Sequence, residues 1–125
     1  QAPGGAGTFE RTGGDHTVTT HDLSSFEGLD CLVPADSPRE IRRVYCCDLL
    51  SLAMARAPAD CAWVTVMGNM NTVAVASLAE VACIVLAEGA AIPEECLNKA
   101  REEGIPVYRT DAPVFETAKG IDQRI

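Results

Sequence analysis

One pattern occurs three times between residues 61 and 119, and it constrains the fold more than any other feature of the sequence. In each occurrence a short apolar strand ends in a small polar loop, and a helix follows. The predicted strands cover residues 61–67, 82–87 and 106–109. Strands that alternate with helices form parallel sheets. The sequence therefore predicts an α/β fold with a mostly parallel sheet, flanking helices and βαβ repeats.

The helices of this repeat are predicted over residues 71–80, 93–103 and 113–119. Gly104 and Gly120 follow the last two helices, as glycine often does where a helix stops. Before the repeat, residues 29–33 and 40–47 predict two strands, and the second leads into a helix that ends at residue 56. We expect Asp48 to be the N-cap of that helix. Asp111 or Thr110 has the same predicted role before the last helix.

The length of 125 residues predicts a single domain. Residues 1–16 are rich in glycine and poor in apolar side chains, so we expect a flexible N-terminal arm. The domain itself is predicted over residues 17–120, with a C-terminal tail over residues 121–125. No apolar run approaches the roughly 20 residues that span a bilayer, so we expect no membrane contact and a cytoplasmic location.

The charge balance argues against nucleic acid as a partner. Ten basic residues are scattered among eighteen acidic ones, and the net charge is −8. Nucleic-acid binding depends on many contacts from Lys and Arg to phosphates, and no basic face is evident here.

The six cysteines are best explained as small apolar residues of the interior. No Cys-x-x-Cys motif occurs, and His16 and His21 lie apart from the cysteines, so we predict no metal site and no cofactor. Cys46 and Cys47 are adjacent, and a redox-sensing role for this pair remains the alternative to simple packing.

Polar side chains concentrate in the loops that follow the predicted strands. Parallel strands bring such loops to one edge of the sheet, where ligands bind in open α/β folds. Helix N-termini at that edge favour anions, whereas its three acidic side chains oppose them and Arg109 is the one nearby cation. A regulatory ligand site, ordinary caps and turns, and catalysis all remain open. The candidate ligand-binding residues are Asp48, Ser51, Gly68, Asn69, Asn71, Thr72, Glu88, Gly89, Thr110 and Asp111.

Enzyme signatures are missing from these loops. No phosphate-binding loop with its lysine is present, no strand ends in a Gly-x-Ser-x-Gly turn, and neither histidine has a plausible nucleophile beside it. We therefore predict a protein that is not an enzyme and has no catalytic residue.

The residues over 47–54, 63–66 and 69–78 together resemble the DRTGG domain family. Residues 84–89, 103–107 and 115–118 continue the resemblance, which extends from about Thr17 to Gly120. The signature positions of the family are occupied here by residues 69–71 and 88–89, which depart from Asp-Arg-Thr. A literal Arg-Thr-Gly-Gly string at residues 11–14 lies in the predicted arm and is interpreted as coincidence.

The resemblance implies a non-catalytic regulatory domain with a fold similar to the N-terminal domain of HPr kinase/phosphorylase. Such domains accompany nucleotide-sensing cystathionine-β-synthase (CBS) domains, and short members resemble those encoded beside iron-only hydrogenases. We expect a homodimer, or docking onto a redox enzyme, with a small nucleotide or anion bound at the sheet edge. The alternative is a structural, partner-binding subunit without a ligand of its own.

Overall fold

The computed structural model describes residues 17–125, and the predicted N-terminal arm and its Arg-Thr-Gly-Gly string lie outside the described residues. Five strands form one sheet in the order β1-β5-β4-β3-β2, in which β1 alone runs antiparallel to its neighbour. The predicted mostly parallel α/β fold is confirmed. The strands are β1 (Asp30–Val33), β2 (Arg43–Cys46), β3 (Cys61–Thr65), β4 (Cys83–Leu86) and β5 (Val107–Arg109). The helices are α1 (Thr20–Leu23), α2 (Leu50–Arg56), α3 (Met70–Ala79), α4 (Glu94–Glu103) and α5 (Val114–Asp122).

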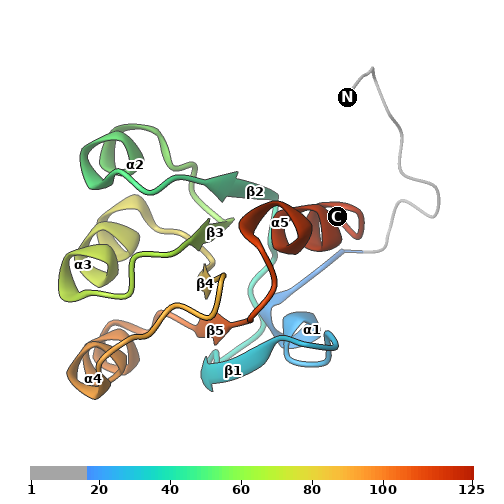
Figure 1. The fold of residues 1–125 in the computed structure, drawn as a ribbon, viewed down its shortest axis with the longest axis horizontal. Coiled ribbons are helices and arrows are strands. Elements are labelled where there is room, and N and C mark those ends of the chain that lie inside the picture. Colours follow the sequence, from blue (N-terminus) through green and yellow to red (C-terminus); the bar gives the residue numbers. More distant parts are fainter. Residues whose placement is uncertain (1–16) are drawn as a thin grey trace.

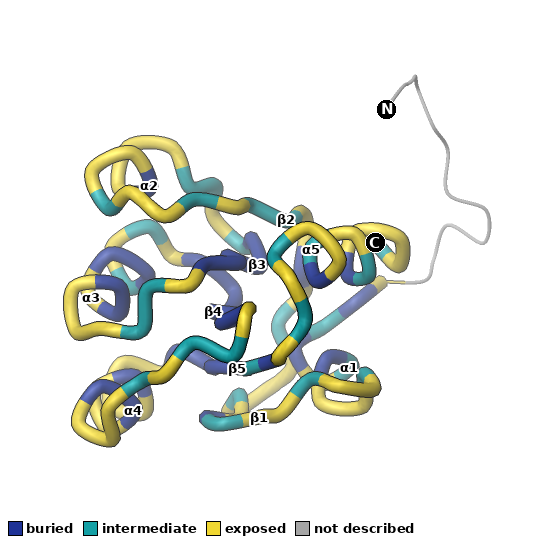
Figure 2. Tube along the Cα trace, viewed as in Figure 1, coloured by how far each residue is buried: buried dark blue, intermediate teal, exposed yellow. Residues whose placement is uncertain are grey.

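Helices cover both faces of the sheet. Figure 1 shows α2, α3 and α4 on one face and α1 and α5 on the other. Side chains alternate between the faces along each strand, so Trp63 and Ile84 pack under α2–α4, whereas Val64 and Val85 pack under α1 and α5. The central strands β3 and β4 are buried throughout, as the dark tube in Figure 2 shows. This double burial explains why the sequence of both strands is an unbroken apolar run.

Most predicted boundaries lie within two residues of those in the structure, and two differ by three residues. The strand expected over residues 40–47 begins only at Arg43, because the Ile41 N–H donates to the Val18 carbonyl at 2.8 Å instead of joining β3. Helix α5 continues past Gly120 to Asp122, and Ile121 is buried against the sheet. Burial of the Ile121 side chain stabilises this additional part of the helix. Gly104, in contrast, ends α4 at the predicted position and has the left-handed conformation.

Two buried ionisable groups make the fold sensitive to alkaline pH. Burial raises the pKa of Tyr108 to about 12 from its ordinary value of 10.0, and that of Cys61 to about 12 from 9.0. As pH rises from about 9 to about 12, the unfolded chain therefore loses protons that the folded chain keeps. The contribution of these two groups to stability is complete below about pH 9 and falls as pH rises toward 12. We predict that the urea midpoint of unfolding decreases steadily in this window. Tyr108→Phe should weaken the decrease above pH 10, and an identical slope would contradict the assignment to Tyr108.

None of the helices within residues 17–125 is long and apolar enough to cross a membrane.

Candidate functional site

The loops after β2, β3, β4 and β5 lie at the carboxyl edge of the sheet and are linked one to the next. The loop after β2 reaches the end of β3 through Asp48, whose carboxylate bonds the Val66 N–H. The loop after β4 reaches the start of α5 through Glu88, whose carboxylate bonds the Val114 N–H. The structure thus brings the predicted site residues to one edge, as the βαβ pattern indicates, and shows what each polar group contacts.

Asp48 does not cap α2, and this prediction is wrong. The N-cap of α2 is Leu49, and no side chain caps the helix. The Asp48 carboxylate instead accepts hydrogen bonds from the buried Thr65 hydroxyl at 2.7 Å and from the Val66 N–H at 2.9 Å. Both donors lie at the end of β3, where they would otherwise lack a protein partner. Asp48 therefore bonds to β3 instead of capping α2.

Asp48→Ala should lower the free energy of unfolding by about 1–3 kcal/mol, because the buried Thr65 hydroxyl loses its acceptor. Asp48→Asn keeps an acceptor oxygen at the same place and should cost less than half as much. Urea denaturation of the two variants measures the difference. Equal destabilisation would show that charge, rather than the hydrogen bonds, is what Asp48 provides.

Asn69 and Thr72 form the start of α3. The Asn69 side chain accepts from the Thr72 N–H at 2.9 Å and from the Thr72 hydroxyl at 3.1 Å, so it is a side-chain N-cap. Gly68, just before it, lies against the loop after β4. A Cβ at Gly68 would be 2.2 Å from the Ala91 carbonyl oxygen, so only glycine fits here without displacing backbone.

The loop after β4 is held by its own turn and by β5. Glu88 and Gly89 both have a positive φ, at 59° and 66°, which reverses the chain tightly after β4. Arg109 donates through Nε to the Ala90 carbonyl and through Nη2 to the Gly89 carbonyl, both at 2.9 Å. Arg109, the cation expected near the bound ligand, therefore holds the backbone of the loop after β4 in place.

The last helix has a different cap from the one expected. The N-cap position of α5 is Pro113, and neither Thr110 nor Asp111 caps it through a hydrogen bond to the helix. The Glu88 carboxylate takes that role by accepting the Val114 N–H at 3.0 Å. Proline at the cap has no side-chain acceptor, which leaves the position open to a carboxylate from the adjacent loop.

Three predicted residues remain exposed at this edge and make no side-chain hydrogen bond within residues 17–125, namely Ser51, Asn71 and Asp111. Most of the other seven candidate residues make contacts that hold the loops together. The ligand-binding role of the ten residues stays a prediction. What the structure adds is that the exposed, available groups are fewer than the sequence indicates.

A cavity of about 300 Å³ lies beside this edge, between α5 and the segment after α1. Thr110 belongs to both the edge and the cavity wall, whereas Phe26, Thr117 and Arg124 were not predicted as site residues. Arg124 falls in the predicted tail, and its guanidinium carbon is 4.3 Å from the centre of the Phe26 ring. No local pattern links residues so far apart in the sequence, so sequence reasoning had no signal for this cavity.

The prediction that the six cysteines are interior residues is wrong for Cys31 and Cys46, which are exposed, and Cys47 is half-buried. All six are free, and burial raises the pKa of the interior Cys61, Cys83 and Cys96. Burial and the nearby Asp48 carboxylate also raise the pKa of the exposed Cys46. The thiolate is the reactive form, so a raised pKa disfavours redox sensing at Cys46. Within residues 17–125 no three His, Cys, Asp or Glu side chains gather in a group that could hold a metal ion.

A family model for the DRTGG domain matches residues 39–124, well over half of the chain. The chain belongs to the DRTGG domain family. A search of curated proteins gives no match for this DRTGG domain. The family assignment agrees with the resemblance carried by the sequence motifs.

Among solved structures, this DRTGG domain is similar to the CBS and DRTGG domains of the regulatory region of Clostridium perfringens pyrophosphatase. That structure is a complex with the activator diadenosine tetraphosphate. The TM-score is 0.65 at 12% sequence identity, and the match covers 78% of this chain and 43% of that chain. Our DRTGG domain thus spans less than half of the length of this neighbour, and the likeness shows a shared fold.

Proposed function

We propose that this DRTGG domain is a non-catalytic regulatory domain that senses a small nucleotide or anion near the carboxyl edge of its sheet. The observation that supports the proposal most is the shared fold with a regulatory region that was solved with a nucleotide activator. Ligands of open α/β sheets gather at the carboxyl ends of the strands, which is where the exposed Ser51, Asn71 and Asp111 lie.

The loop contacts make this edge a suitable place for a sensor. Asp48 ties the loops after β2 and β3, and Glu88 ties the loop after β4 to α5. A ligand that contacts one loop therefore acts on its neighbours. Such linkage is what a regulatory domain needs to convert binding into a change at another surface.

The proposed partner is a second copy of the chain or a redox enzyme such as an iron-only hydrogenase. The hydrogenase follows from the resemblance to short members encoded beside such enzymes. The homodimer is supported by α3, which is apolar on several sides and leaves Leu78 69% exposed. A monomeric mass from light scattering would contradict the homodimer, and failure to co-purify with the hydrogenase would contradict that partner.

A thermal-shift panel tests ligand sensing. It should contain adenine nucleotides, nicotinamide cofactors and simple anions. A ligand that binds only the folded state at a concentration of about 100 Kd stabilises it by about 2.7 kcal/mol. We expect at least one nucleotide or anion to raise the melting temperature in a saturable way. A flat response to the whole panel would contradict the sensing function.

A structural, partner-binding subunit is the second candidate function, and one observation favours it. Most polar groups of the edge are already hydrogen-bonded within the chain, while large apolar side chains around α2 are exposed. These are Leu49, Leu52, Met54, Val66 and Met70. Exposed apolar surface of this kind is typical of interaction sites. If the structural function is right, Leu52→Glu should abolish co-purification with the partner. If ligand sensing is right, the same variant should keep its ligand-induced stabilisation.

A further inference from the structure

We infer that the ligand is a nucleoside monophosphate and that it binds in the cavity between α5 and the segment after α1. This inference rests on the proposed sensing function and gives it a location and a ligand class. The cavity has a volume of about 300 Å³, which is at the lower end of small-molecule sites. That volume suits one nucleotide and excludes a dinucleotide held entirely within it.

Arg124 provides the phosphate-binding group. Its guanidinium stacks on the Phe26 ring at 4.3 Å from the centroid. Among residues 17–125 it takes part in no side-chain hydrogen bond or ion pair, so all its N–H donors are free for a ligand. Arginine binds phosphate with paired N–H groups, and stacking on Phe26 holds the guanidinium plane in place for such contacts.

The inner wall of the cavity suits a base and a ribose. Leu29 and Ile121 provide apolar surface against which a flat ring can pack. Thr110 and Thr117, two residues that are largely buried, add hydroxyl groups to the lining. The Thr110 oxygen accepts the Ala112 N–H, so its own proton remains to be donated. The Thr117 hydroxyl donates to the Pro113 carbonyl, so its lone pair remains to accept. One wall thus presents a donor and an acceptor to a nucleoside.

The charges around the cavity select the number of phosphates. Glu27 and Glu116 also line it. Their carboxylates can accept hydrogen bonds from the amino group of a base, but they repel additional phosphates. Because the cavity is lined by one guanidinium and the whole chain has a net charge of −8, a triphosphate is disfavoured relative to a monophosphate.

The cavity is also connected to the rest of the edge. Thr110 and Ala112, which line it, are bonded through their carbonyls to the N–H groups of Gly89 and Glu88. Glu88 in turn caps α5. A bound nucleotide would therefore contact both α5 and the loop after β5, whose carbonyls accept the Gly89 and Glu88 N–H groups.

Isothermal titration calorimetry of the full chain with adenosine 5′-monophosphate tests this inference. We expect saturable binding that is at least about tenfold weaker for Arg124→Gln, because the paired phosphate contacts are lost. Arg56→Gln, at the end of α2 on the opposite face of the sheet, is the matched control and should bind as the unchanged chain does. Adenosine triphosphate should bind more weakly than the monophosphate, and Glu116→Gln should narrow that gap. Melting curves confirm that each variant is folded.

Each other outcome overturns a distinct claim. If the monophosphate binds but Arg124→Gln leaves its affinity unchanged while Asp111→Asn weakens it, the cavity is the wrong location and ligand sensing stands. If another panel member binds and the monophosphate does not at about 1 mM, the ligand class is wrong. If nothing in the panel binds, both the inference and the proposed sensing function fail.

Discussion

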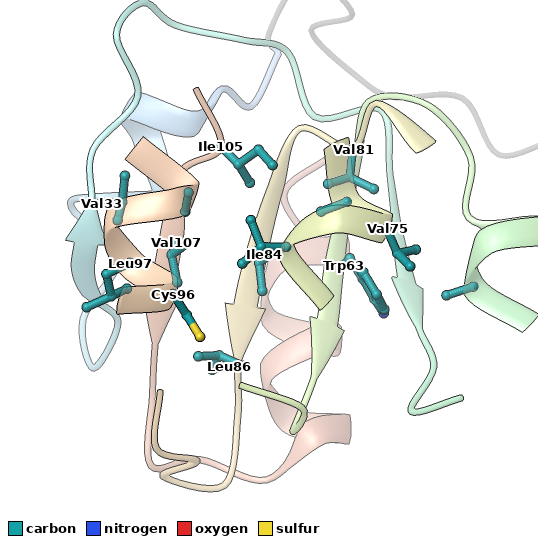
Figure 3. Packing of buried hydrophobic residues seen from close by; sticks show 14 of the residues in the cluster. Val33, Trp63, Val75, Val81, Ile84, Leu86, Cys96, Leu97, Ile105 and Val107 are labelled. Carbon is teal, nitrogen blue, oxygen red and sulfur yellow. The ribbon is translucent and has the colours of Figure 1, made fainter. Parts of the chain in front are cut away.

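Trp63→Ala should lower the free energy of unfolding by about 3–5 kcal/mol, the largest effect expected for a single substitution in this domain. Trp63 lies on the central strand β3 and has no solvent exposure. Figure 3 shows its ring between the sheet and the helices of that face, next to Val75. Its indole N–H also donates to the Cys47 carbonyl at 3.0 Å, which holds the loop after β2. The alanine variant loses both the packing and this hydrogen bond.

Trp63→Phe is the matched control. It retains an aromatic ring in the core but leaves the Cys47 carbonyl without its donor, so we expect about half the loss. Urea denaturation at neutral pH measures both variants. A loss below about 1 kcal/mol for Trp63→Ala would contradict the placement of this side chain in a close-packed core.

Gly68→Ala should be the second most damaging of the substitutions considered, at about 1–3 kcal/mol or more. A Cβ at this position would approach the Ala91 carbonyl oxygen to 2.2 Å, and backbone cannot move aside as a flexible side chain can. The loops after β3 and β4 must therefore separate. Because they form the carboxyl edge, we also expect weaker ligand binding in this variant.

Gly120→Ala controls for the general effect of replacing glycine. Gly120 is inside α5, its φ is not positive, and a Cβ there would meet no atom within 4 Å. Alanine is the better helix former, so this variant should gain about 0.5–1 kcal/mol. Similar melting temperatures for Gly68→Ala and Gly120→Ala would contradict the close approach of the two loops.

The elements that sequence reasoning located well are those whose signal is local. The runs in β3 and β4 are apolar at every position because both faces of these strands are covered, and Gly104 ends α4 where predicted. The order of strands and helices was then enough to predict the parallel sheet and the edge at which its loops meet.

The contacts that sequence reasoning missed depend on residues far apart in the chain. Asp48 has the residue type and position of an N-cap, but the Thr65 hydroxyl, 17 residues away, takes its carboxylate. The stacking of Arg124 on Phe26 arises only because the segment after α1 and the end of α5 meet on one face of the sheet. Neither contact leaves a periodic or compositional trace.

The most direct test of ligand sensing in the cavity between α5 and the segment after α1 is an amide NMR titration of the isotope-labelled full chain with adenosine 5′-monophosphate. We predict that saturable shifts appear at Gly28, Thr110, Thr117 and Gly120, which line the cavity, and at Glu88, whose N–H bonds the Ala112 carbonyl. Amides in α2, on the opposite face, should not move. Shifts confined to residues near Ser51 and Asn71 would place the ligand elsewhere on the edge, and no shift at all would contradict nucleotide sensing by this domain.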